Sequence, residues 1–405
     1  MTQPSTSTRT PAPTAAPLGV ALASYVNMFA VGTAYALSIL QSDLPRLMNT
    51  SHNWSFAPFG AASAGLTVGV VTASTLIAES GGRSTAARGT ALWGLAVLST
   101  GHFLASLNFP AVLASLVFGG IGVGWTYLAI ILMVSQAFPN SPLARSAIGP
   151  LGFSSGAAAS FTISAYYQSS TRSSDEIGSF LKLAGVAFIS VGVATIILLP
   201  SDASKSEPGP STGHDQKVSR GSRRGMLWAL LFFNALPGMV AFSALLPGAS
   251  YYDPTAVNTS SPNGLPLIML ALAAGGLLAS PLSSFLGIPR AFNVLFCARG
   301  LLLVAFSQWP NQGLAIGTLA TILFGHGVGF SILPGLVKAE LARPELFPLE
   351  YGQILTAWGA SGVVASIGNA ALSSLPGDLA RPSLVLGLLI HLVAIVGNLA
   401  SPFRD

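Results

Sequence analysis

The sequence predicts an all-α membrane protein whose twelve transmembrane helices form two halves of six helices each. Three observations support this prediction. The 405 residues are 51% hydrophobic and only 8% charged, whereas a soluble domain carries about 25% charged residues. Apolar runs of about 20 residues, the length that crosses a bilayer as a helix, recur along the chain. One long polar stretch, residues 200–224, divides these runs six and six.

Each expected helix is a run of apolar residues, without the alternating polarity of a barrel strand. Because the runs are apolar on all sides, they suit helices that pack against one another within lipid. The expected spans are residues 19–40, 57–78, 88–107, 110–137, 146–168, 179–199, 225–246, 264–284, 289–308, 312–335, 351–374 and 383–402.

The segments outside the spans predict the domain organisation and the orientation. Residues 1–18 are rich in Ser, Thr and Pro and are expected to form a disordered tail. Residues 19–199 would form the N-terminal half, 200–224 a cytoplasmic linker and 225–405 the C-terminal half. Thirteen basic residues fall in the loops on the side of the termini and four on the other side. The positive-inside rule therefore predicts that both termini are cytoplasmic.

Several other classes of function are disfavoured. The run Gly120-Ile-Gly-Val-Gly124 lies within an expected helix rather than between a strand and a helix, so it does not predict a dinucleotide site. No glycine run leads into a P-loop lysine, and Cys297 is the single cysteine. The basic residues are scattered rather than clustered. We therefore expect no enzyme activity, no cofactor, no metal site and no nucleic-acid partner.

A local repeat supports the division into halves. Phe118-Gly-Gly-Ile-Gly-Val-Gly124 in the fourth span is similar to Phe324-Gly-His-Gly-Val-Gly329 in the tenth, about half a chain later. Each is followed by a polar loop with an arginine and then by a helix rich in Gly and Ser. Parallel repeats of this kind occur in membrane transporters. Glycine-rich spacing also recurs in packed membrane helices in general, which is the alternative explanation.

Four longer stretches carry a resemblance to a known family. They are Asn27-Met-Phe-Ala-Val-Gly-Thr-Ala-Tyr35-Ala-Leu-Ser38, the run GVGWTYLAIILMVSQAFPNSPLARSAIGPLGFSSGAA, the run GVGFSILPGLVKAEL and the run YGQILTAWGASG. In these stretches the chain resembles the oxalate/formate antiporter group of the major facilitator superfamily, which is related to the monocarboxylate transporters. The expected eighth helix has no charged residue and the eleventh has no lysine. The paired basic groups with which the oxalate carrier binds a dicarboxylate are therefore not expected here.

The resemblance and the polar residues within the spans together predict the substrate site. Tyr35, Tyr127 and Trp358 match positions that line the substrate path in the family. Arg299 is the fixed positive charge within a span and is a natural partner for a carboxylate. His326 lies in a Gly-His-Gly step, and histidine exchanges protons near neutral pH. The structural alternatives are packing for the aromatic residues, hydrogen bonding for His326 and snorkelling for Arg299.

The expected function is secondary active transport of a small organic anion, with a monocarboxylate as the favoured substrate and protons as a candidate coupling ion. Two alternatives stay open: a facilitator or efflux pump for a neutral or amphipathic metabolite or drug, and a transport-dead sensor or scaffold. The expected partners are the small-molecule substrate, the lipid bilayer and protons. We expect a monomer, in the plasma membrane rather than in an organelle.

Overall fold

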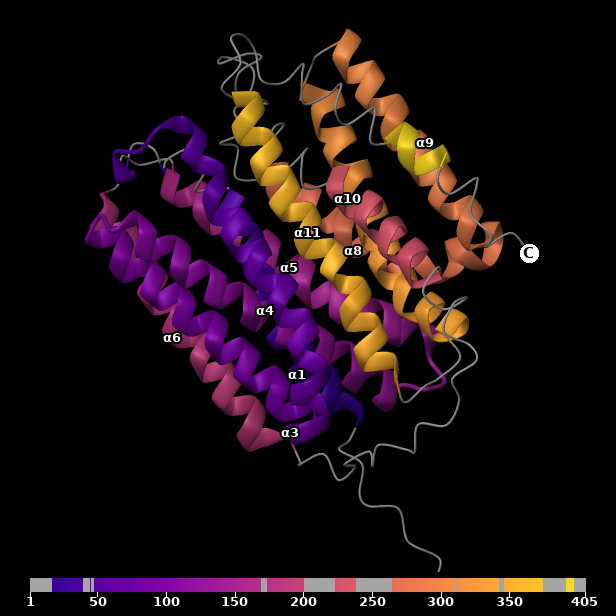
Figure 1. Cartoon of the computed structure of the whole chain (residues 1–405), viewed down its shortest axis with the longest axis horizontal. Coiled ribbons are helices and arrows are strands. Elements are labelled where there is room, and N and C mark those ends of the chain that lie inside the picture. Colours follow the sequence, from indigo (N-terminus) through magenta and orange to yellow (C-terminus); the bar gives the residue numbers. More distant parts are fainter. Residues whose placement is uncertain are drawn as a thin grey trace, which may run out of the picture.

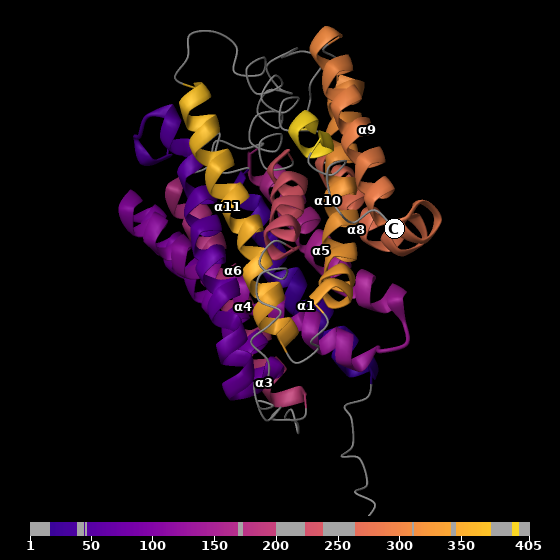
Figure 2. The same ribbon diagram turned by 45° about the vertical axis from the view of Figure 1, so that its right-hand side comes forward.

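The computed structural model describes residues 17–38, 44, 47–168, 173–199, 223–237, 264–309, 312–341, 346–373 and 391–396. Every regular element within these residues is a helix. The helices before residue 200 pack into one group and those after residue 222 into another, shown from indigo to magenta and from orange to yellow in Figure 1. Figure 2 shows the two groups turned. The expected tail and linker fall almost wholly outside the described residues.

The elements follow the expected spans. The first group contains α1 (Pro17–Gly32), the 3₁₀ helices η1 (Thr33–Ser38) and η2 (His52–Phe56), α3 (Ala57–Ala105), α4 (Phe109–Ala137), α5 (Pro142–Gln168) and α6 (Ser174–Leu198). The second group contains helix 223–237, α8 (Gly264–Leu286), α9 (Ile288–Gln308), α10 (Gln312–Leu341), α11 (Phe347–Ser373) and the helical residues 391–396. Eight of the described helices are long and apolar enough to cross a membrane.

Two expected boundaries were wrong. One concerns residues 17–38, because the first span is not a single α-helix and changes at Gly32 into the 3₁₀ helix η1. The other is the start of the third span, which begins directly after Gly81 rather than at residue 88. The separation of the second and third spans was correct, because α3 consists of two helices that meet at a kink at Gly81 (φ 81°, ψ 163°). Glycine adopts this positive φ without the steric cost that a Cβ brings.

Close approach of backbones holds the first group together. A methyl group at Gly65 would overlap the Val117 carbonyl, and one at Gly120 would overlap the Ala62 carbonyl. The α3 and α4 backbones therefore touch where these glycines lie, as small residues permit in membrane helices. The glycine run of the fourth span is thus a packing surface.

A buried polar network joins four helices of the same group. The Asn27 side chain donates to the Thr195 hydroxyl at 2.7 Å and accepts from the Thr90 hydroxyl at 2.6 Å. Thr90 lies 3.2 Å from the Thr126 hydroxyl. Because the interior offers these groups no water, each must find a protein partner. The network therefore fixes α1, α3, α4 and α6 relative to one another.

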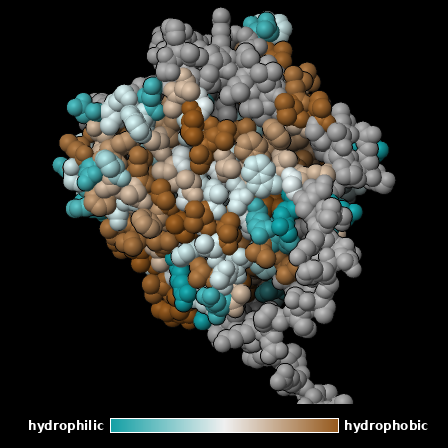
Figure 3. Space-filling view, viewed as in Figure 1, coloured by the Kyte–Doolittle hydropathy of each residue, from teal (hydrophilic) through white to brown (hydrophobic). Residues whose placement is uncertain are grey.

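The two groups meet along α3 with α11 and α5 with α8. Gly359 and Gly362 of α11 lie against Ser63 and Thr67 of α3, so a methyl group at either glycine would overlap a hydroxyl oxygen. On the outside, broad apolar patches lie among the coloured residues in Figure 3. Phe285 is 86% exposed and Ile197 72% exposed. Such a surface suits lipid rather than water.

The α3–α4 contact gives a stability prediction. Gly120→Ala places a methyl group against the Ala62 backbone, which cannot move away as a flexible side chain would, and is expected to cost about 1–3 kcal/mol. The thermal unfolding midpoint of the protein in detergent should fall. Gly335→Ala is the control, because nothing lies within 4 Å of a methyl group there. Equal midpoints for the two variants would contradict this packing.

Candidate functional site

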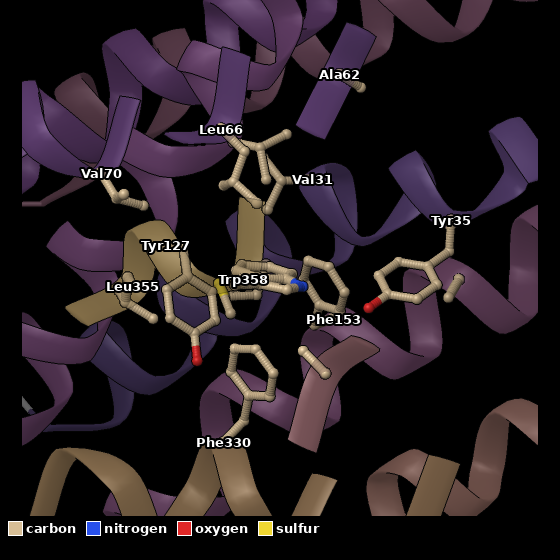
Figure 4. Close-up of a cluster of buried hydrophobic side chains, with 14 of the residues drawn as sticks. Val31, Tyr35, Ala62, Leu66, Val70, Tyr127, Phe153, Phe330, Leu355 and Trp358 are labelled. Carbon is tan, nitrogen blue, oxygen red and sulfur yellow. The ribbon is translucent and has the colours of Figure 1, made fainter. Parts of the chain in front are cut away.

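An aromatic cluster lies at the centre of the molecule, where the two groups of helices meet. The first group contributes Tyr35 from η1, Tyr127 from α4 and Phe153 from α5, and the second contributes Phe330 from α10 and Trp358 from α11. The Trp358 ring lies between the others, with centroid distances of 5.1 Å to Tyr127, 5.7 Å to Phe153 and 4.8 Å to Phe330 (Figure 4). The rings meet mostly edge to face, which is a favourable geometry for aromatic pairs.

The position of Tyr35 depends on the change from α1 to η1. The Trp93 indole of α3 donates to the Ala30 carbonyl at 2.9 Å and to the Thr33 hydroxyl at 3.0 Å. These two acceptors lie where the winding changes, and Gly32 between them leaves no room for a side chain beside the Phe153 carbonyl. Trp93 and Gly32 thus hold the segment that carries Tyr35 at the centre.

A hydrogen bond crosses between the two groups at Tyr35. Its hydroxyl lies 3.2 Å from His326 Nε2, and which of the two atoms donates depends on the tautomer of His326. The His326 ring also stacks on Phe330, with centroids 4.6 Å apart.

Arg299 lies beside this cluster rather than in it. Its side chain is fully buried, and it donates to the Asn234 carbonyl at 3.2 Å and the Ile322 carbonyl at 2.8 Å. The guanidinium occupies the space that a side chain at Gly325 would need. It is close enough to His326 for the two groups to interact electrostatically. Arg299 therefore turns inward against α10, and no acidic side chain among the described residues pairs with it.

The structure thus brings four of the five expected site residues together and places the fifth alongside. Tyr35, Tyr127, His326 and Trp358 are all at least 96% buried. The sequence analysis missed Phe153 and Phe330 as members of the cluster. Phe330 lies one helical turn after His326, a spacing that could have revealed it. Among the described residues, no group of three His, Cys, Asp or Glu could hold a metal ion.

Comparison with known proteins identifies the fold through a solved structure rather than through a related sequence. No family model matches the sequence, and no curated protein sequence matches it. Among solved structures, the chain is similar to the human organic anion transporter MFSD10 (TETRAN), with a TM-score of 0.63 and 16% sequence identity over 94% of this chain and 99% of that one. This chain is an all-α membrane protein with the major-facilitator fold.

The hydrogen bond at Tyr35 gives a second prediction. Tyr35→Phe removes the hydroxyl and leaves His326 Nε2 without this partner, at a cost of about 1–3 kcal/mol. The unfolding midpoint in detergent should fall. Tyr25→Phe on the same first span is the matched control, because the described residues give the Tyr25 hydroxyl no hydrogen bond to lose. A midpoint unchanged by Tyr35→Phe would show that the cross-group bond does not stabilise this arrangement.

Proposed function

We propose that this protein is a secondary membrane transporter for a small organic anion, with a monocarboxylate as the favoured substrate. The observation that carries the proposal is the buried charge of Arg299, which contacts backbone carbonyls and the ring of Phe296 at 5.9 Å. Carbonyl oxygens solvate a guanidinium but do not neutralise it. A buried ion without a counter-ion is costly, and charges within membrane spans commonly mark substrate or ion pathways.

The surroundings of Arg299 agree with this choice of substrate. The Tyr35 hydroxyl and the His326 ring supply polar groups at the centre, while Phe153, Phe330 and Trp358 supply apolar surface. A small carboxylate with a short apolar part matches such a mixture of surfaces. The similar structure MFSD10 is named as an organic anion transporter, which is consistent with an anionic substrate here.

The proposed mechanism is alternating access, in which the two groups of helices rock about the centre. To open on one side, the groups must separate along α3–α11 or along α5–α8. The bond between Tyr35 and His326 also joins the two groups, so it is expected to break or re-form during the cycle.

We further propose that both termini lie in the cytoplasm. We also propose that the protein is a monomer in the plasma membrane.

The aromatic cluster also supports a second candidate function, transport or efflux of a neutral or amphipathic molecule. Five aromatic rings in mutual contact would suit such a ligand. The two functions differ in their need for Arg299. A screen of labelled carboxylates and neutral metabolites in proteoliposomes would distinguish them, because a neutral substrate gains nothing from a buried cation.

Removal of the buried charge is therefore the direct test. Arg299→Ala is expected to lower carboxylate uptake by at least about tenfold, since the loss of a buried charge partner costs about 2–5 kcal/mol. Arg299→Lys should retain some uptake, because it keeps the charge but loses the planar fork. Arg223→Ala, which breaks a 3.4 Å surface pair with Glu340, is the control. Normal carboxylate uptake by properly inserted Arg299→Ala protein would exclude this proposal.

Proton coupling is tested separately, at His326. Its ring contacts Tyr35 across the two groups and interacts with Arg299, so a proton gained there would affect both. His326→Gln keeps hydrogen bonding but cannot titrate. It is expected to abolish accumulation driven by an imposed pH gradient while substrate exchange continues. His102→Gln, at an exposed position on α3, should behave as the parent. If the His326 variant still accumulates substrate as the parent does, the proton is carried elsewhere.

A further inference from the structure

One face of α10 is lined by two glycines, Gly325 and Gly329, which we call the glycine face. They are four residues apart, so they lie one turn apart and about 40° from each other around the helix. The space of the missing side chain at Gly325 is occupied by the Arg299 guanidinium, whose Nε would lie 2.7 Å from a methyl group there. The space at Gly329 is occupied by the Asn234 amide, whose Cγ would also lie 2.7 Å from a methyl group.

Within the part of the chain that the structure describes, the Asn234 side-chain amide has no hydrogen-bond partner. Its residue is fully buried, yet within the described part of the chain neither Oδ1 nor Nδ2 has a hydrogen bond. Only its backbone carbonyl is engaged, by Arg299 at 3.2 Å. The donor and acceptor groups of a buried amide normally have hydrogen-bond partners, because a buried group without a partner costs about 1–3 kcal/mol. This amide is therefore available to a bound molecule.

Two further orphan atoms lie on the same side of α10. Arg299 Nε and His326 Nδ1 are buried and have no hydrogen-bond partner among the described residues. His326 lies about 60° from Gly329 around the helix, so its ring borders the glycine face. Nδ1 donates or accepts according to the tautomer of the ring. The orphan set thus contains donors on Arg299 and the Asn234 nitrogen, one acceptor, the Asn234 oxygen, and His326 Nδ1, which can serve as either.

We propose that Asn234 is a specificity-determining residue, which binds the transported anion beside Arg299 and selects anions that carry a hydroxyl group. The proposal rests on the proposed function. The donors of Arg299 and Asn234 match the oxygens of a carboxylate. The remaining acceptor, Asn234 Oδ1, requires a donor on the ligand, and a hydroxyl group near the carboxylate supplies it. A carboxylate without that hydroxyl leaves Oδ1 buried and unmatched, which is how a polar site rejects an analogue.

The test compares glycolate with acetate, two acids of equal carbon number that differ by one hydroxyl group. Each sodium salt is titrated into the purified full-length protein in detergent at constant ionic strength, and the rise in unfolding midpoint gives the affinity. The parent is expected to bind glycolate about fivefold more tightly than acetate, the effect of one net hydrogen bond. Asn234→Leu, which keeps a similar volume, should reduce this ratio to about one. Asn293→Leu, on the side of α9 about 120° from Arg299, should leave it unchanged.

A second pair of variants tests the same site without changing Asn234. Gly329→Ala would push the amide aside, because its methyl group would overlap Nδ2, and should also lower the ratio to about one. Gly335→Ala, on the same helix in open space, should retain it. Equal affinities of the parent for glycolate and acetate would overturn the role of Asn234 but leave anion transport standing, as would a ratio unaffected by Asn234→Leu. If neither acid stabilises the parent and no carboxylate is taken up, the proposed function fails as well.

Discussion

The burial of one positive charge sets the requirements for the C-terminal group of helices. Arg299 can lie within the membrane only because carbonyls of helix 223–237 and α10 solvate it and because Gly325 leaves space for its guanidinium. Each requirement fixes a neighbour: α9 must face α10, and helix 223–237 must approach both. The same arrangement places the Arg299 guanidinium at Gly325, the residue before His326. The His326 ring in turn stacks on Phe330 of the aromatic cluster. In this group, the need to solvate the charge of Arg299 therefore also determines how the helices pack.

The N-terminal group meets a different constraint with different means. It buries neutral polar groups, and Asn27, Thr90, Thr126 and Thr195 satisfy one another. Asn27 contrasts with Asn234, whose amide has no hydrogen-bond partner among the described residues, although both asparagines are fully buried within a helix. A satisfied network makes a rigid body, whereas an unsatisfied one is poised for a ligand. The N-terminal group thus holds Tyr35 in position, and the C-terminal group holds the charge of Arg299.

Much of the fold could be predicted from the sequence, because hydropathy alone determines which segments cross a membrane. The kink at Gly81 falls between two expected spans, 57–78 and 88–107. The change of winding at Gly32 could not be predicted, since Gly32 lies against the Phe153 carbonyl of a distant helix. For the site, family-like positions identified Tyr35, Tyr127 and Trp358, and the cost of burying charge identified Arg299 and His326. Asn234 is also a polar residue within an expected span, but this signal does not separate a ligand contact from a structural role. Within the described residues, the lack of a hydrogen-bond partner distinguishes Asn234 from Asn27.

The 3₁₀ segment that carries Tyr35 has a mechanical consequence. A 3₁₀ helix rises about 2.0 Å and turns 120° per residue, against about 1.5 Å and 100° in an α-helix. If the six residues of η1 rewound to α-helix, the segment would shorten by about 3 Å and the tyrosine would swing round the helix axis. Such a rewinding would withdraw the hydroxyl from His326. Because Trp93 holds Ala30 and Thr33 at the N-terminal end of η1, the movement would fall on the residues that follow Thr33.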